Sequence, residues 1–291
     1  MSSNVWRTLF TSNFDCGQYL YHYTSIEKAI KIIYSKQLWF SSINNTNDTT
    51  EAKLRIKFKK VNSNKNITPD ERTLAVTNYL SQRSDSIRIL CFSQDADLTE
   101  KELNQAIKLH YNHEKDKYFD ISGRGFALPR MWAQYASNHE GVCFIINKKI
   151  FDQKLSSLVF LKESIVHYKN FFTCHEIDET QLNCLYNRIT QHSNGLLSFL
   201  DLLYNDKHFI EYNYFEKQKD WENEREYRYI ALVDRSILNP NIQINGLFDF
   251  VQGIVIGEKI DPAYENVIRK SVESRCEVKK IHFDTNMCYV S

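Results

Sequence analysis

The residues best suited to chemistry lie between Trp221 and Arg228. Glu224 and Glu226 are two positions apart in the segment EREYRYIAL, whose pattern predicts a strand over 224–232. Successive side chains of a strand point to opposite faces, so both carboxylates would share one face with Arg228 beside them. Two such carboxylates can hold a hydroxyl group and orient a second reactant. The same pattern fits a solvated strand face with Glu–Arg pairs, which periodicity alone favours.

Two further groups of residues could line a site with these carboxylates. The first comprises His22, Tyr23 and Thr24, at the end of a short predicted strand. A histidine between aromatic residues at a strand end can also be a core or capping residue. The second comprises Trp132 and Tyr135, which have i, i+3 spacing on a short predicted helix. These two rings could simply pack on one helix face, so both interpretations stay open.

Polar residues at other strand ends are weaker candidates. Ser93 follows the strand-like segment SIRILCFS and could line a cleft, although a serine in this position more often forms a turn. Asn47 and Asp48 follow another predicted strand, where capping of the next helix is the better interpretation. Of these three residues we therefore keep only Ser93 as a site candidate.

Metal and nucleotide-loop motifs have little support. His110, His113 and Glu114 share one face of a predicted helix, but the surrounding LHYNHEKDK is strongly polar and favours a solvated surface, so we predict no metal site. The sequence has no G-x-G-x-x-G or Walker-type loop, which argues against Rossmann and P-loop nucleotide binding. Seven cysteines without C-x-x-C spacing argue against zinc knuckles and disulfide frameworks, and favour a reducing compartment.

Composition is that of an ordinary globular protein. The 291 residues are 42% hydrophobic and 25% charged, with a net charge of +1, so any affinity for a polyanion would need a local patch. The first residues lack the apolar core of a signal peptide, and no run approaches the roughly 18 apolar residues of a membrane span. We therefore expect a cytoplasmic protein with no membrane partner.

The elements that must position these residues alternate irregularly along the chain. Residues 20–23, a helix from 26 and residues 38–41 predict an opening strand–helix–strand unit, with Thr24 and Glu27 as a capping box. Further strands are predicted at 86–93, 142–146, 158–168, 224–232, 250–257 and 277–283. Helices are predicted at 51–61, 68–81, 97–118 and 262–274, and residues 178–218 are expected to be mostly helical. This order indicates an α+β fold. We interpret residues 1–291 as one domain with a helical insertion at about 171–220.

The order of short motifs along the chain resembles a bacterial family, domain-of-unknown-function family 2971. The motifs are YHYTS, LWFSS, ND..E, CFS, MWAQYASNHEGVCF, W..E.EYR and IVIG, and they extend over nearly the whole chain. That family in turn resembles the ADP-ribosyltransferase superfamily, including DNA-targeting toxins, through the opening His-Tyr-Thr and the Glu-x-Glu strand. The resemblance implies a split mixed or antiparallel sheet core with helical insertions, and NAD as the substrate.

The resemblance also implies a role for individual residues. Glu226, with Glu224 before it, matches the glutamate that holds the 2′-hydroxyl of the nicotinamide ribose, and these two are the expected catalytic residues. The resemblance places His22 at the adenosine-side ribose, while Tyr135 is our candidate to stack on nicotinamide. The expected NAD-binding residues are His22, Tyr23, Thr24, Ser93, Trp132, Tyr135 and Arg228.

Three functions follow from these expectations. The first is transfer of ADP-ribose to a macromolecule, protein or nucleic acid, by a toxin or anti-phage effector with an inhibitor or defence-system partner. The second is hydrolysis of NAD on the same scaffold. The third is a binding or regulatory module that has kept the fold and lost the reaction. The sequence does not identify the acceptor.

Overall fold

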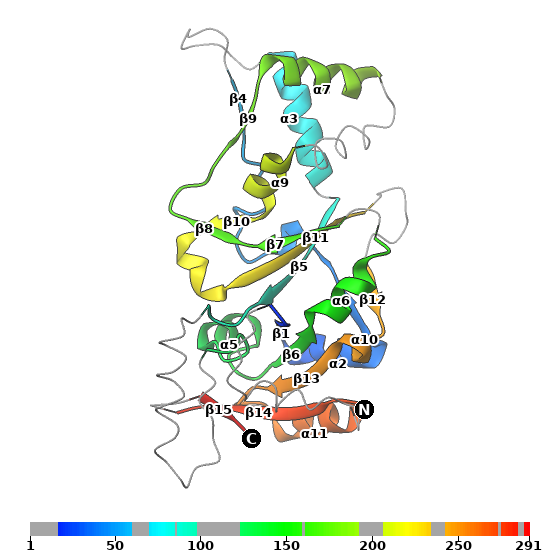
Figure 1. Cartoon of the computed structure of the whole chain (residues 1–291), viewed down its shortest axis with the longest axis vertical. Coiled ribbons are helices and arrows are strands. Elements are labelled where there is room, and N and C mark those ends of the chain that lie inside the picture. Colours follow the sequence, from blue (N-terminus) through cyan, green and yellow to red (C-terminus); the bar gives the residue numbers. More distant parts are fainter. Residues whose placement is uncertain are drawn as a thin grey trace.

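The structure is a computed structural model of the chain, and Figure 1 shows its elements. It describes residues 17–59, 70–84, 86–97, 123–158, 161–191, 206–233, 242–272, 275–284 and 288–291. The predicted helix at 97–118 and the residues His110, His113 and Glu114 lie outside these ranges, apart from position 97. Within the described part, no helix is both long and apolar enough to cross a membrane.

A mixed sheet runs through the described part of the chain and confirms the α+β class. Its order is β15 (Cys288–Val290), β14 (Glu277–Phe283), β13 (Val251–Ile256), β6 (Val142–Asn147), β1 (Tyr19–Thr24), β5 (Ile87–Ser93), β11 (Glu226–Leu232) and β7 (Leu161–Ile165). The short β3 (Ser41–Ser42) pairs with β5 beside this path. The pairs are antiparallel except for β13 and β14, which run parallel. The specific ADP-ribosyltransferase arrangement stays a prediction.

The opening strand–helix–strand order is confirmed, but the cap differs and the strand predicted at 38–41 divides into two short strands. β1 is followed by α2 (Ile26–Ser35) and β2 (Gln37–Trp39), and β2 pairs with β12 (Gln243–Asn245). Ser25, rather than Thr24, caps the helix, because the Ser25 side chain accepts the backbone N–H of Lys28. Thr24 is still part of β1 and is buried. The chain leaves α2 through Lys36, whose left-handed φ of 56° ends the helix.

Both faces of the central strands are covered, which explains their nearly continuous apolar sequences. Along β6, residues 142, 144 and 146 enter one apolar cluster, while 143 and 145 enter another. The first cluster includes residues of α2, α6 (Lys148–Leu155), α10 (Leu247–Phe250) and α11 (Pro262–Val272). The second cluster includes residues of α5 (Pro129–Tyr135), which lies on the other side of β1 (Figure 1). These layers enclose the central strands on both faces.

A third apolar cluster joins the elements drawn above the sheet in Figure 1. They are β4 (Ile56–Phe58), α3 (Glu71–Ser84), β9 (His175–Ile177), α7 (Glu179–Gln191) and α9 (Lys207–Tyr214). The helix predicted at 51–61 is wrong, because turns lead into β4, which pairs in parallel with β9. The region 178–218 contains helices α7 and α9, as predicted, and ends in β10 (Glu216–Gln218).

Three short elements complete the surroundings of β11. β8 (His167–Lys169) pairs in parallel with β10, so residues expected as one strand at 158–168 divide between β7 and β8. The 3-10 helix η2 (Lys219–Glu224) leads from β10 to the start of β11. A second 3-10 helix, η1 (Ile43–Asn45), follows β3. β8 and η2 lie at the N-terminal end of β11, and η1 lies against β5.

Candidate functional site

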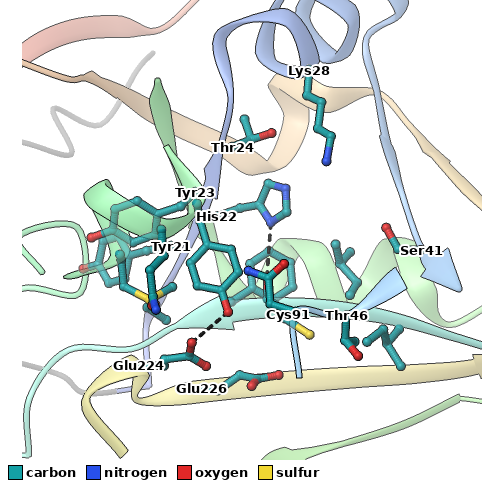
Figure 2. Close-up of a pocket in the computed structure, with 18 of the residues that line it drawn as sticks. Tyr21, His22, Tyr23, Thr24, Lys28, Ser41, Thr46, Cys91, Glu224 and Glu226 are labelled. Carbon is teal, nitrogen blue, oxygen red and sulfur yellow. Dashed lines mark hydrogen bonds between the residues drawn. The ribbon is translucent and has the colours of Figure 1, made fainter. Parts of the chain in front are cut away.

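A cleft of about 570 Å³ opens between the α2 end of β1, the C-terminal part of β5 and the start of β11. Its volume is within the range of small-molecule and cofactor sites, about 300–1,000 Å³. Residues of α2, η1, α5, β10 and η2 complete the lining. Figure 2 shows Lys28 on one side of the cleft, Glu224 and Glu226 on the opposite side, and His22 between them.

Glu224 and Glu226 converge in the cleft, but not through the alternation predicted from sequence. Glu226 is the first residue of β11, whereas Glu224 is the last residue of η2 and precedes the strand. Arg225 between them has a left-handed φ of 47°, which turns the chain. Both carboxylate side chains are nearly fully buried and both line the cleft. The turn therefore brings together two carboxylates that a regular strand would have spaced along one face.

Lys217 on β10 lies between the two carboxylates. Its Nζ is 2.7 Å from Oε2 of Glu224 and 3.3 Å from Oε2 of Glu226. The lysine side chain is only 4% exposed. Sequence analysis did not select Lys217, because a single lysine in a polar segment resembles any surface lysine. Only the pairing of β10 with β8 places it in the cleft.

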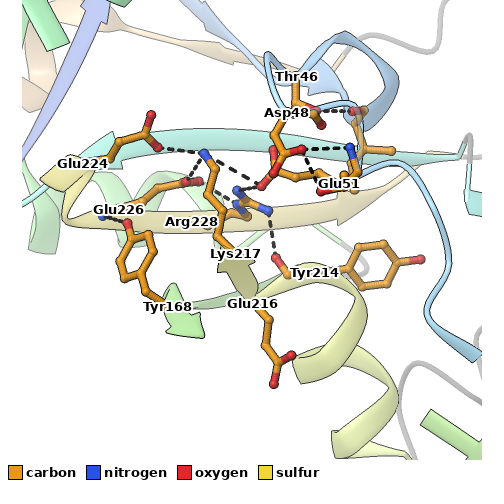
Figure 3. Close-up of polar contacts among 12 residues, drawn as sticks. Thr46, Asp48, Glu51, Tyr168, Tyr214, Glu216, Lys217, Glu224, Glu226 and Arg228 are labelled. Carbon is orange, nitrogen blue, oxygen red and sulfur yellow. Dashed lines mark hydrogen bonds and ion pairs between the residues drawn. The ribbon is translucent and has the colours of Figure 1, made fainter. Parts of the chain in front are cut away.

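Arg228 forms the second cationic contact of Glu226. Its Nε donates to Oε1 of Glu226 at 2.6 Å, and a guanidinium nitrogen pairs with Glu51. A further nitrogen donates to the carbonyl of Tyr214 at 3.0 Å. Arg228 lines the cleft and its contacts organise carboxylates, while its expected contact with NAD stays a prediction. Glu51, Lys217, Glu224, Glu226 and Arg228 are called the cleft cluster below (Figure 3).

The charges of the cleft cluster give its carboxylates different acidities. Burial alone would raise the pKa of Glu226, but the adjacent Arg228 and Lys217 outweigh it and lower the pKa. For Glu224, burial is the dominant cause and raises the pKa, although Lys217 partly opposes it. Burial would lower the pKa of Lys217, but the surrounding carboxylates raise it instead. The cluster thus combines one strongly acidic carboxyl with one that gains a proton more readily.

Two tyrosines outside the cluster hold Glu224 and Glu226 in place, one through a carboxylate and one through the backbone. The hydroxyl of Tyr135 donates to Oε1 of Glu224 at 2.7 Å, and burial raises the pKa of this phenol. Tyr168 of β8 accepts the backbone N–H of Glu226 at 2.8 Å. Tyr135 lines the cleft as predicted, although its hydroxyl is committed to Glu224. Its stacking on nicotinamide stays a prediction.

His22 presents a hydrogen-bond acceptor to the cleft. Its Nδ1 is 3.2 Å from the carbonyl oxygen of Cys91, which can only accept, so Nδ1 carries the proton and Nε2 has the free lone pair. Burial lowers the pKa of His22 to about 4, which keeps the ring neutral near pH 7. Figure 2 shows the ring between Lys28 and the carboxylates, in a position to accept a hydroxyl or amino hydrogen.

The other predicted binding residues have different surroundings. Thr24 and Ser93 line the cleft and are buried, and Oγ of Ser93 has no hydrogen-bond partner among the described residues. Tyr23 also reaches the lining, but its hydroxyl donates to the carbonyl of Gly125 at 2.7 Å. Trp132 does not line the cleft: it is fully buried and its indole donates to the carbonyl of Phe126. The core interpretation of Trp132 therefore replaces the binding one.

The structure also adds residues that sequence analysis did not assign. Glu51 belongs to the motif ND..E but received no role, because its partner Arg228 is 177 positions away. Lys28 and Lys31 of α2 line the cleft and are exposed. Their i, i+3 spacing on the predicted helix was the signal that could have selected them. Among the described residues, no group of three or more His, Cys, Asp or Glu is placed to hold a metal ion.

Comparison with known proteins supports one part of the resemblance. No curated protein and no solved structure matches the chain. Residues 131–229 match the model of a family described as Protein of unknown function (DUF2971). This segment supplies Tyr135, Lys217, Glu224, Glu226 and Arg228 to the cleft. The resemblance to ADP-ribosyltransferases stays a prediction, and the chain is similar to the DUF2971 family through the segment that carries most of the cleft's charged residues.

Proposed function

We propose that the cleft binds NAD and transfers its ADP-ribose group to a macromolecular acceptor. The observation that carries the proposal is the convergence of the Glu224 and Glu226 carboxylates in a ligand-sized cleft, with the neutral imidazole of His22 between them and Lys28. The resemblance to ADP-ribosyltransferases also assigned Glu224 and Glu226 to the reaction and His22 to NAD binding. The family match covers both glutamates but names no activity.

The distribution of charge across the cleft supports a dinucleotide. Lys28 and Lys31 are exposed on the α2 side, and within the described part of the chain their ammonium groups form no hydrogen bond or ion pair. The anionic carboxylates lie on the opposite side, with His22 between. NAD has a matching polarity, because its pyrophosphate is anionic while its nicotinamide ribose becomes cationic as the reaction proceeds. In this orientation the pyrophosphate faces α2 and the nicotinamide ribose faces Glu226.

The proposed transfer depends more on stabilising the positive charge that develops on the ribose than on a strong base. When the bond between C1′ of the ribose and the nicotinamide nitrogen breaks, its electron pair leaves with nicotinamide and positive charge develops on the ribose. A carboxylate that accepts the ribose 2′-hydroxyl stabilises that charge more than it stabilises the ground state. A nucleophile of the acceptor then forms the new bond to C1′ and releases its proton. The low pKa of Glu226 keeps it anionic for this role, and Glu224 is the group suited to orient the acceptor.

The proposal is tested by incubating the protein with NAD labelled in the adenosine part and a cell lysate. We expect wild-type protein to label a macromolecule, and Glu226→Gln to lower labelling about 100-fold or more. Glu216→Gln is the matched control, because Glu216 is equally buried but does not line the cleft. Thermal unfolding of each variant shows whether a loss of labelling reflects chemistry or folding.

The products separate the alternatives. Free ADP-ribose without a labelled macromolecule would replace the transferase by an NAD glycohydrolase at the same site. Folded wild-type protein that consumes no NAD would contradict both enzymes and leave a binding module. Glu226→Gln that retains full turnover would remove Glu226 from the reaction.

A further inference from the structure

Lys217 is the point at which carboxylates from three segments meet. Its Nζ is 2.7 Å from Glu224 of η2, 3.3 Å from Glu226 of β11 and 4.0 Å from Oε1 of Glu51. Figure 3 shows the lysine side chain rising between these groups. The nitrogens of Arg228 contact Glu226, Glu51 and the Tyr214 carbonyl, and among these contacts none reaches Glu224. Among the described cations, Lys217 is therefore the ion-pair partner of Glu224.

The position of Lys217 is fixed by its backbone and by an aromatic ring. β10 pairs in parallel with β8, with Lys217 opposite Tyr168, so the strand register sets where its side chain begins. The ring of Trp221 lies 4.6 Å from the ammonium and provides a cation–π contact. An ammonium is a compact point charge with three donors, which suits a position shared between several carboxylates.

The cleft cluster keeps an excess of negative charge despite these two cations. Its three glutamates face one lysine and one arginine, so full ionisation leaves one negative charge more than the cations supply. Without Lys217, the Glu224 and Glu226 carboxylates would repel each other in a buried site. One of them would then take up a proton or turn away, and the pair would no longer face the same point.

We propose that Lys217 is a positioning residue that holds the Glu224 and Glu226 carboxylates side by side, so that both face a single cationic centre of the ligand. This inference rests on the proposed function, in which that centre is the nicotinamide ribose. Lys217 itself is engaged by the carboxylates and takes no proton from the substrate. The charged and titratable groups around it are Glu51, Cys91, Tyr135, Tyr168, Glu224, Glu226 and Arg228.

The first test compares Lys217→Gln, Lys217→Arg and the control Lys169→Gln, measuring nicotinamide release at about pH 5 to 9. Lys169 also pairs with a buried glutamate, Glu216, but does not line the cleft. We expect Lys217→Gln to lower the rate about 10- to 100-fold at pH 7 and to move the acidic limb of the pH–rate profile to higher pH. Lys217→Arg should return this limb to its wild-type pH, because arginine restores the positive charge. Lys169→Gln should leave both the rate and the acidic limb unchanged.

A second readout does not depend on activity and separates failure of this inference from failure of the proposed function. Glutamate side-chain carboxyls labelled with ¹³C report their own titration, and Glu224→Gln assigns the signal of Glu224. The Glu224 signal should titrate at higher pH in Lys217→Gln than in wild type, even if neither protein consumes NAD. A folded Lys217→Gln protein with an unchanged Glu224 titration would overturn the inference. So would an unchanged acidic limb in an active variant.

If Lys217→Gln does not fold, the double variant Lys217→Gln/Glu224→Gln removes both members of the pair and restores the balance of charge. We expect this variant to fold and its Glu226 signal to titrate close to that of the wild type, because the repulsion is gone. A Glu226 signal in the double variant that titrates at clearly higher pH than in wild type would show that Lys217 acts on each carboxylate separately, which contradicts a shared arrangement.

Discussion

Glu216 and Lys217 are neighbours on β10, yet their side chains enter two buried charged regions of different kinds (Figure 3). Lys217 points into the cleft cluster. Glu216 points the other way, where it pairs with Lys169 and accepts the N–H and the hydroxyl of Thr173, both at 3.1 Å. Alternation along a strand separates the two groups, although they are adjacent in sequence.

The partners of each group explain what the difference means. Glu216 bonds a loop backbone and a lysine that is 41% exposed, so its contacts fasten the segment after β8. The cleft cluster instead joins side chains from the loop after η1, β10, η2 and β11, and several of them face a cavity. Buried charge that faces a cavity is available to a ligand, whereas buried charge that bonds a loop is used by the fold itself.

The largest expected effect comes from breaking the cleft cluster at Arg228. Arg228→Met should lower the free energy of unfolding by about 3–5 kcal/mol, because Glu226 and Glu51 are left buried without their partner. Glu216→Gln should lower it by only about 1–2 kcal/mol, since the amide keeps part of its hydrogen bonding. Chemical denaturation at neutral pH measures both values. Equal losses would mean that the two regions are not energetically different.

Much of the core could be predicted because its signals are local. β5, β6, β13 and β14 have apolar runs of strand length, and α2 and α11 have helical spacing with buried faces. The helix expected at 51–61 failed because its charged residues fit a helix equally well, while their actual structure depends on pairing between β4 and β9, more than 100 positions apart. Such pairing leaves no mark within either segment.

The candidate site was predictable to the same extent. Glu224, Glu226, Tyr135 and His22 have residue types that suggested chemistry, and all four line the cleft. Lys217 could not be selected, because its role depends on the β10–β8 pairing and on a turn at Arg225. Trp132 was selected wrongly for the opposite reason: its aromatic type suggested binding, but its surroundings are the core.

Two buried histidines, His22 at the cleft and His175 on β9, allow a test at acidic pH. Burial lowers the pKa of His22 to about 4, below the value of 6.5 for an unperturbed imidazole. Between these values the unfolded chain binds the proton and the folded protein does not, so stability is complete above about pH 6.5 and falls as pH decreases to 4. Because His22 is partly open to the cleft, we expect a loss of about 1–2 kcal/mol.

Substitution of each histidine shows which one causes the loss of stability at acidic pH. His22→Asn should flatten the dependence of unfolding free energy on pH, because the group that gains a proton on unfolding is gone. Burial also lowers the pKa of His175, which lies on β9 opposite Asp206 at 3.2 Å. His175→Asn should therefore flatten the slope as well, but only His22→Asn should weaken binding of NAD. Loss of NAD binding in both variants would show that the cleft depends on the β9 region.

The smallest effect should distinguish two tyrosines that hold adjacent carboxylate residues. Tyr135→Phe removes the hydroxyl that donates to Glu224, a loss of about 1 kcal/mol, or roughly fivefold in rate. It should also raise the pKa of Glu224, because this hydrogen bond opposes the effect of burial, so the acidic limb of activity moves to higher pH. Tyr168→Phe leaves the backbone N–H of Glu226 without its acceptor but removes no donor from a carboxylate. Tyr168→Phe should lower stability by a similar amount without moving the acidic limb of the pH–rate profile.

A shift of this limb in both variants would mean that it reports general loosening of the start of β11. A shift in Tyr135→Phe alone would identify Glu224 as the group whose ionisation the reaction needs.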